Sequence, residues 1–138
     1  MQAQIQRLIG TVVLGVALVA QSLPAWAGAV ANAQVTIGYS NGGSIAGAAG
    51  TLTGARYSAD STQYIGCEVE KHDGYSPYIL CAARNLAGTS VSCSSTDPRL
   101  VDAVQAITDS SFIEFGVTGN GSGICSDLTV TNGSHNLR

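Results

Sequence analysis

Four cysteines, all between positions 67 and 125, constrain this chain more than any other feature of its sequence. They are Cys67, Cys81, Cys93 and Cys125. In a short exported chain, an even number of cysteines indicates a disulfide framework. At roughly 2–4 kcal/mol each, two disulfides would rival the net stability of a small domain, which is on the order of 5–15 kcal/mol. We therefore interpret all four cysteines as structural.

The first 27 residues have the pattern of a cleavable signal peptide. Arg7 and the amino terminus are weakly basic, residues 8–20 form an apolar run without charge, and alanines stand at positions 25 and 27. The apolar run is shorter than the roughly 20 residues that a membrane-spanning helix needs. Cleavage is predicted after Ala27, with Ala33 as the alternative. We expect a secreted or periplasmic protein that has no membrane attachment after cleavage.

The charge of the remaining chain argues against some classes of partner. Beyond residue 27, nine acidic residues stand against five basic ones, which gives a net charge of −4. Nucleic acids and anionic lipids are bound through clustered lysine and arginine, and the sequence has no such cluster. We expect neither of them as a partner.

Around the first three cysteines the sequence predicts an antiparallel meander. Residues 62–70, 78–84 and 89–93 have the character of strands, and the first two are separated by a turn that contains Asp73-Gly74 and Pro77. Asn85 begins the second turn. This pattern predicts a single small domain that consists mostly of β-strands.

The meander places cysteines opposite one another. Cys67 is expected opposite Cys81, and Cys81 opposite Cys93, so that the three share one face of the sheet. This arrangement permits a Cys67–Cys81 bond or a Cys81–Cys93 bond. The sequence leaves open all three ways of connecting four cysteines in two disulfides. We favour Cys67–Cys81 together with Cys93–Cys125, because the second bridge would then join the meander to the C-terminal hairpin.

A helix and two further strands are predicted after the meander. Asp97 is a suitable N-cap, Pro98 suits the first helical position, and an apolar stripe continues to Ile107. Residues 111–117 and 124–131 read as a strand pair. By simple alternation, Ile124, Ser126, Leu128 and Val130 would share one face and Cys125 the other.

The predicted fold class is α+β, a small antiparallel sheet of about five to six strands with one covering helix and two disulfides. The domain would span residues 51–132 and would begin with a strand over 51–58. Residues 28–50 are expected to be a flexible segment, rich in glycine and alanine, with a short strand at 34–39. Residues 133–138 are expected to be a disordered tail.

One weak candidate for a metal or catalytic site lies next to Cys67. Glu68, Glu70 and His72 alternate along the predicted strand, so they would project from one face, where two carboxylates and an imidazole could hold a divalent metal. The simpler interpretation is the solvent face of an antiparallel sheet. We therefore predict no metal, no other cofactor and no catalytic residue.

The tyrosines are the other residues that could take part in recognition. Tyr57, Tyr64, Tyr75 and Tyr78 fall in or near the first predicted strands. Tyrosines in loops can form platforms for carbohydrate or protein, but half-buried packing on a strand is the expected role here.

The cysteine meander, Asp97-Pro98, residues 109–115, Gly123-Ile124-Cys125 and residues 128–134 together resemble small secreted bacterial proteins with two disulfides. The resemblance covers residues 64–134. No activity is assigned to that group, so the resemblance implies export and disulfides only.

These observations favour a non-enzymatic secreted or periplasmic protein that acts by binding a protein or a carbohydrate. A first alternative is a structural subunit that self-assembles by adding residues 35–39, on a flexible arm, to a neighbour's sheet edge. A second alternative is a small hydrolase or metal-dependent enzyme centred on Glu68, Glu70 and His72.

Overall fold

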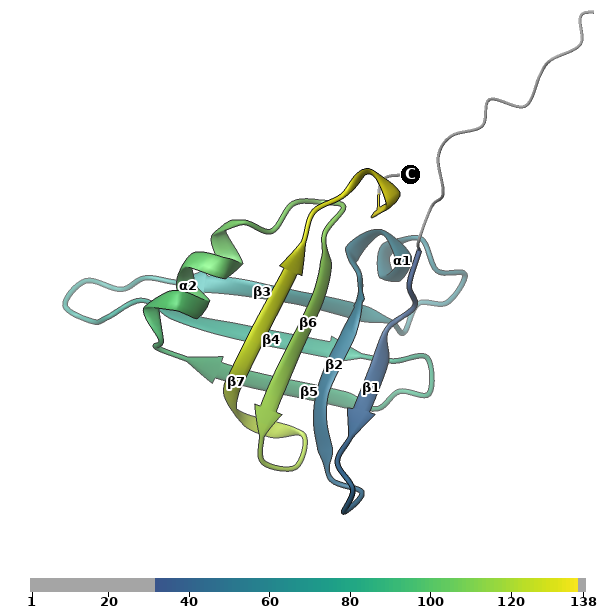
Figure 1. Ribbon diagram of the computed structural model, residues 1–138, viewed down its shortest axis with the longest axis horizontal. Helices are drawn as coiled ribbons and strands as arrows, with labels where there is room; N and C mark the ends of the chain where they lie inside the picture. Colours follow the sequence, from purple (N-terminus) through teal and green to yellow (C-terminus); the bar gives the residue numbers. More distant parts are fainter. Residues whose placement is uncertain (1–31, 137–138) are drawn as a thin grey trace, which may run out of the picture.

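The computed structural model describes residues 32–136, so the predicted signal peptide and its cleavage sites lie outside the described residues. Seven strands and three short helices follow one another along the chain (Figure 1). In order they are β1 (Thr36–Tyr39), β2 (Ile45–Thr51), α1 (Leu52–Arg56), β3 (Tyr64–Glu70), β4 (Tyr78–Arg84), β5 (Ser90–Ser95), α2 (Pro98–Gln105), β6 (Phe112–Thr118), β7 (Ser122–Thr131) and the 3-10 turn η1 (Ser134–Asn136).

The strands form a single sheet in the order β1-β2-β6-β7-β5-β4-β3. Figure 1 shows this sheet folded into two layers, with β3, β4 and β5 crossing behind β1, β2, β6 and β7. Side chains from both layers meet between them, and the largest fully buried apolar ones are Phe115, Ile79, Ile113 and Val91. The core is therefore a sandwich whose layers belong to one continuous sheet.

The sheet is mixed rather than antiparallel, because β5 pairs in parallel with β7. Ser92 in β5 donates its main-chain N–H to the carbonyl of Gly121 (3.0 Å). This pairing joins the meander to the second layer. The prediction of an antiparallel sheet with five to six strands was wrong on both counts, because pairing between distant strands leaves no periodic trace in the sequence.

The meander and the disulfides are as expected. Cys67 lies opposite Cys81, and Cys81 lies opposite Cys93. The bonds are Cys67–Cys81 and Cys93–Cys125, which confirms the favoured connectivity. The second bond connects the meander to β7.

Residues 45–51, expected within the flexible N-terminal segment, instead form β2 in the interior of the sheet between β1 and β6. Small side chains are what this position requires, because a Cβ on Gly47 would lie 2.2 Å from the carbonyl oxygen of Phe115. The strand expected on a free arm is β1, and it is already paired with β2.

The first predicted strand of the domain is also wrong, since residues 52–56 form the short helix α1. Thr51 caps it: its side-chain oxygen accepts a hydrogen bond from the main-chain N–H of Gly54 (2.9 Å). Gly54 also lies against the carbonyl of Ala33, where a Cβ would be 2.4 Å from the oxygen. These contacts favour a turn of helix over a strand.

A β-bulge changes the faces of β7. Gly116 pairs with Asp127, but the next residue, Val117, pairs with Cys125, so Ser126 is passed over. Cys125 is thereby buried on the same side as the half-buried Leu128. Simple alternation had placed these two residues on opposite faces.

The helix α2 and the C-terminus complete the fold. Asp97 accepts from the main-chain N–H of Arg99 and Pro98 opens α2, as predicted. The expected disordered tail is ordered at least to Asn136, which is 1% exposed and accepts a hydrogen bond from Thr53. Among the described residues, no helix has the length and apolarity needed to cross a membrane.

Candidate functional site

All four cysteines form disulfides, and three of them are buried in the core. The Sγ atoms of Cys81, Cys93 and Cys125 lie within 4.8 Å of one another. Three sulfurs at this spacing could hold a metal ion only as free thiolates, whereas here each belongs to a disulfide. Their role in this structure is to link β3 to β4 and β5 to β7.

The weak metal candidate does not assemble as a three-residue group. Glu70 and His72 are in contact, with 3.1 Å between Oε2 and Nε2, but Glu68 does not join them in any cluster of metal-ligating atoms among the described residues. The same Oε2 of Glu70 also accepts a hydrogen bond from the hydroxyl of Tyr78 (2.5 Å). The rings of His72 and Tyr78 stack, with centroids 6.3 Å apart.

The hydrogen bond from Tyr78 shifts the pKa of both side chains that it joins, Glu70 and Tyr78. It is the main reason why the pKa of Glu70 lies below its ordinary value, with a second contribution from His72. The same bond raises the pKa of Tyr78 above its ordinary value. The alternating pattern missed Tyr78, although a cross-strand partner of Glu70 could have been read from the hairpin register.

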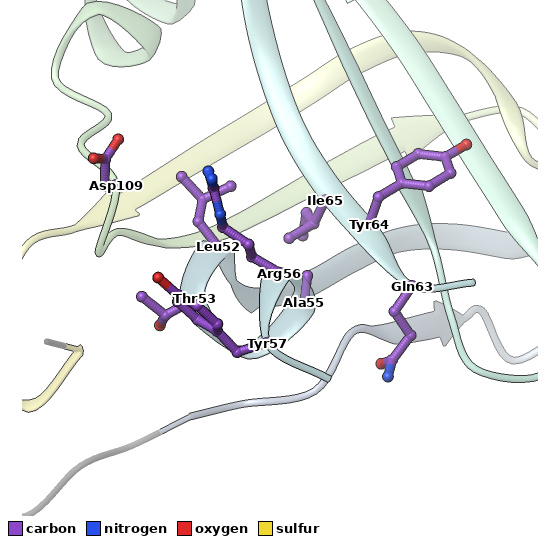
Figure 2. Close-up of a pocket in the computed structure, with 9 residues that line it drawn as sticks. All are labelled: Leu52, Thr53, Ala55, Arg56, Tyr57, Gln63, Tyr64, Ile65 and Asp109. Carbon is purple, nitrogen blue, oxygen red and sulfur yellow. The ribbon is translucent and has the colours of Figure 1, made fainter. Parts of the chain in front are cut away.

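A second site lies between the helix α1 and the first residues of β3 (Figure 2). It is an open pocket of about 460 Å³, a volume within the range of small-molecule sites, which is roughly 300–1,000 Å³. The residues that line it are Leu52, Thr53, Ala55, Arg56, Tyr57, Gln63, Tyr64, Ile65 and Asp109.

The floor of this α1–β3 pocket is apolar in part, with the buried Thr53 and Gln63 beside its apolar residues, and its rim carries polar and aromatic side chains. Ala55 and Ile65 are buried, and Leu52 packs partly against the core. On the rim, Tyr57 is 53% exposed and Tyr64 is 46% exposed. The expectation of half-buried packing on a strand was wrong for Tyr57, which follows α1, whereas Tyr64 does begin the strand β3.

The rim carries one cation and one anion. Arg56 ends α1, and Asp109 belongs to the loop between α2 and β6; in the view of Figure 2, Arg56 lies between Asp109 and Tyr64. Both charged side chains are exposed. Within residues 32–136, Arg56 makes no ion pair, so its guanidinium can bind an anionic group of a ligand.

A hydrogen-bond network holds the pocket wall in place. The carboxylate of Asp60 accepts from the main-chain N–H groups of Thr62 and Gln63 (2.7 and 2.8 Å) and from the Gln63 side-chain amide (2.7 Å). Gln63 in turn accepts from the main-chain N–H of Val35 (3.0 Å). The hydrogen bonds to the Asp60 carboxylate hold its pKa well below its usual range, and the bond from the Gln63 side chain contributes most.

Sequence reasoning missed the α1–β3 pocket. Arg56 and Tyr57 were assigned to a strand, and Asp109 is far from them in sequence. Only the two-layer packing brings α1, the start of β3 and the loop before β6 together. The one signal of this pocket in the sequence was the group of tyrosines near the first predicted strands.

Fold and site define a disulfide-linked β-sandwich domain with an open, partly apolar pocket between α1 and the start of β3. No family model, no curated protein and no solved structure matches the chain.

Proposed function

We propose that this is an exported, non-enzymatic binding protein whose ligand occupies the α1–β3 pocket. The observation that carries the proposal is the combination, in one opening, of a buried and partly apolar floor, two exposed tyrosines and an arginine that forms no ion pair within the described chain. Ligand sites commonly combine apolar walls with a few well-placed polar groups.

The charges indicate the kind of small ligand. A guanidinium offers a planar pair of donors that matches a carboxylate. Asp109 stands on the same rim and would repel a multiply charged anion such as a phosphate ester. A monocarboxylate with an apolar body satisfies both the floor and the rim.

Export is a separate part of the proposal. It is supported by the signal-peptide pattern and by the two disulfides, since such bonds persist in oxidising compartments. Mass spectrometry of the mature protein from a fractionated culture tests it. We expect an amino terminus at residue 28 or 34 in the exported fraction. A cytosolic protein that retains Met1 would contradict export.

Binding is tested by titrating the oxidised, ¹⁵N-labelled protein with phenylacetate and with hexanoate, followed by NMR. We expect saturable shifts of the amides of Ala55 and Ile65. Arg56→Gln should weaken binding about tenfold, the order expected for one charge-assisted pair. Lys71→Gln, which removes another exposed positive charge, from the β3–β4 loop, is the matched control and should bind as the unmodified protein does. Absence of saturable shifts with both acids would overturn the proposed site.

A further inference from the structure

The strand β3 forms one edge of the sheet, and the register shows which of its main-chain groups face outward. The Cα atoms of Cys67 and Cys81 are 4.0 Å apart, the short spacing of an antiparallel pair that is not joined by main-chain hydrogen bonds. The main-chain N–H of Asn85 donates to the carbonyl of Thr89 (3.0 Å), so these two residues form a bonded pair at the end of the β4–β5 ladder. Bonded pairs recur at every second residue, which makes Cys81 and Cys93 a bonded pair as well. The main-chain groups of Cys81 therefore point toward β5 and away from Cys67.

Because bonded and non-bonded pairs alternate, Gly66 and Glu68 bond to β4, whereas the N–H and C=O groups of Ile65, Cys67 and Val69 point away from it. No hydrogen bond connects these outward groups to another part of residues 32–136. An exposed row of such groups is a template for an added strand.

The free edge leads into the α1–β3 pocket. Cys67 and Val69 are partly exposed, while Ile65 is 6% exposed and lines the pocket opposite α1. Figure 1 shows α1 at the end of the layer where β3 begins. An added strand that runs antiparallel to β3 would therefore pass Val69 and Cys67 and reach the pocket at Ile65. We place its end there, because α1 packs against β3 at this point.

We infer that the ligand is the carboxyl-terminal end of an extended peptide, an inference that rests on the proposed function of the pocket. The peptide adds to the edge of β3, its last side chain enters the apolar floor, and its terminal carboxylate binds Arg56. A chain end suits the site better than an internal segment, since the pocket offers one cation where the added strand stops.

The register also specifies two side chains of the peptide. Directly opposite residues share a face, so the last residue, opposite Ile65, points to the apolar floor. The residue three positions earlier lies opposite Glu68, whose exposed carboxylate favours lysine or arginine there. The partner is therefore a protein or peptide with an apolar last residue and a basic residue three positions before it.

The probe is the peptide acetyl-Ser-Lys-Thr-Ser-Val with a free carboxyl end, titrated into the oxidised protein. The same peptide with an amidated end is the control. We expect the free acid to bind at least tenfold more tightly than the amide. Arg56→Gln should remove that difference, and Glu68→Gln should weaken binding a few-fold. Replacing the peptide lysine by glutamate should also weaken binding.

Amide hydrogen exchange tests the added strand directly. The bound peptide should slow exchange at Ile65 and Cys67, while Gly66 and Glu68, already bonded to β4, serve as internal controls and should change little. Equal binding of the acid and the amide, or unchanged exchange at Ile65 and Cys67, would overturn this inference. If phenylacetate still binds in that case, the proposed function of the pocket is retained. If neither the peptide nor the small acids bind, both proposals fail. Protection of Cys67 that rises with protein concentration alone would assign the edge to a second copy instead.

Discussion

Cys81 lies directly opposite Cys93 in the β4–β5 ladder, yet each of the two is bonded to a different cysteine. Their Sγ atoms, with that of Cys125, lie within 4.8 Å of one another. A thiolate at Cys81 would therefore be close to the second disulfide. Exchange proceeds by attack of a thiolate on a disulfide sulfur, so the pairing is open to rearrangement once the first bond is removed.

Cys67→Ser should expose this rearrangement. After incubation at pH 8.5, acid quenching and alkylation of the unfolded chain, we expect the label on Cys93 or Cys125 as well as on Cys81. Peptide mapping by mass spectrometry distinguishes these sites. The double variant Cys67→Ser with Cys81→Ser has no free thiol and should take no label. Label on Cys81 alone would show that the second bond is out of reach.

Loss of the first bond, which closes a loop of sequence separation 14, should cost about 3 kcal/mol.

Gly47→Ala should destabilise the sheet by roughly 1–3 kcal/mol, because the added Cβ would lie 2.2 Å from the carbonyl oxygen of Phe115 and β2 would have to move from β6. Gly66→Ala is the matched control, since it also lies within a strand but its Cβ would meet nothing within 4 Å. Urea unfolding gives both free energies. Equal stability of the two variants would mean that β2 does not pack as closely as described.

Asp60→Asn should lower stability at neutral pH, because the ionised carboxylate accepts three hydrogen bonds from Thr62 and Gln63. The pKa of Asp60 is depressed in the folded protein. Its stabilisation is therefore complete above the unfolded-state pKa of about 4 and is lost as the pH falls further. The difference in Tm between the two proteins should be largest above pH 5 and should shrink toward pH 2. A difference in Tm that does not vary with pH would contradict this assignment.

Asn136→Ala tests whether the C-terminal turn belongs to the domain. The Asn136 side chain donates to the carbonyl of Thr131 (3.1 Å) and is 1% exposed. Its removal leaves that carbonyl without this partner, which should cost about 1–3 kcal/mol in urea unfolding. Ser134→Ala, at an exposed position of the same turn, should change little. An Asn136 variant as stable as the unmodified protein would indicate that the turn contributes nothing.

Local patterns predicted those parts of the fold in which neighbouring residues interact. The meander follows from alternation and from turns such as Asp73-Gly74, and its register placed Cys67 opposite Cys81 as observed. The start of α2 follows from Asp97 and Pro98, whose effects act within one helical turn. The same reasoning failed at α1, where the cap from Thr51 is local but the contact of Gly54 with Ala33 is not.

The candidate site was less predictable than the fold. Glu70 and His72 do meet, but the third member of their hydrogen-bonded cluster is Tyr78 and not Glu68. The α1–β3 pocket depends on Asp109 and Arg56, which are brought together by the packing of layers and not by any spacing in the chain.

The sequence by itself determined the meander, the register of its cysteines and the start of α2, because each depends on residues close together along the chain. The tertiary structure alone decided the parallel pairing of β5 with β7, the bulge that turns Cys125 inward and the incorporation of β2 into the sheet. Those features depend on contacts between distant segments. Their free energy comes from burying side chains between two layers, and no local pattern records which layers will meet.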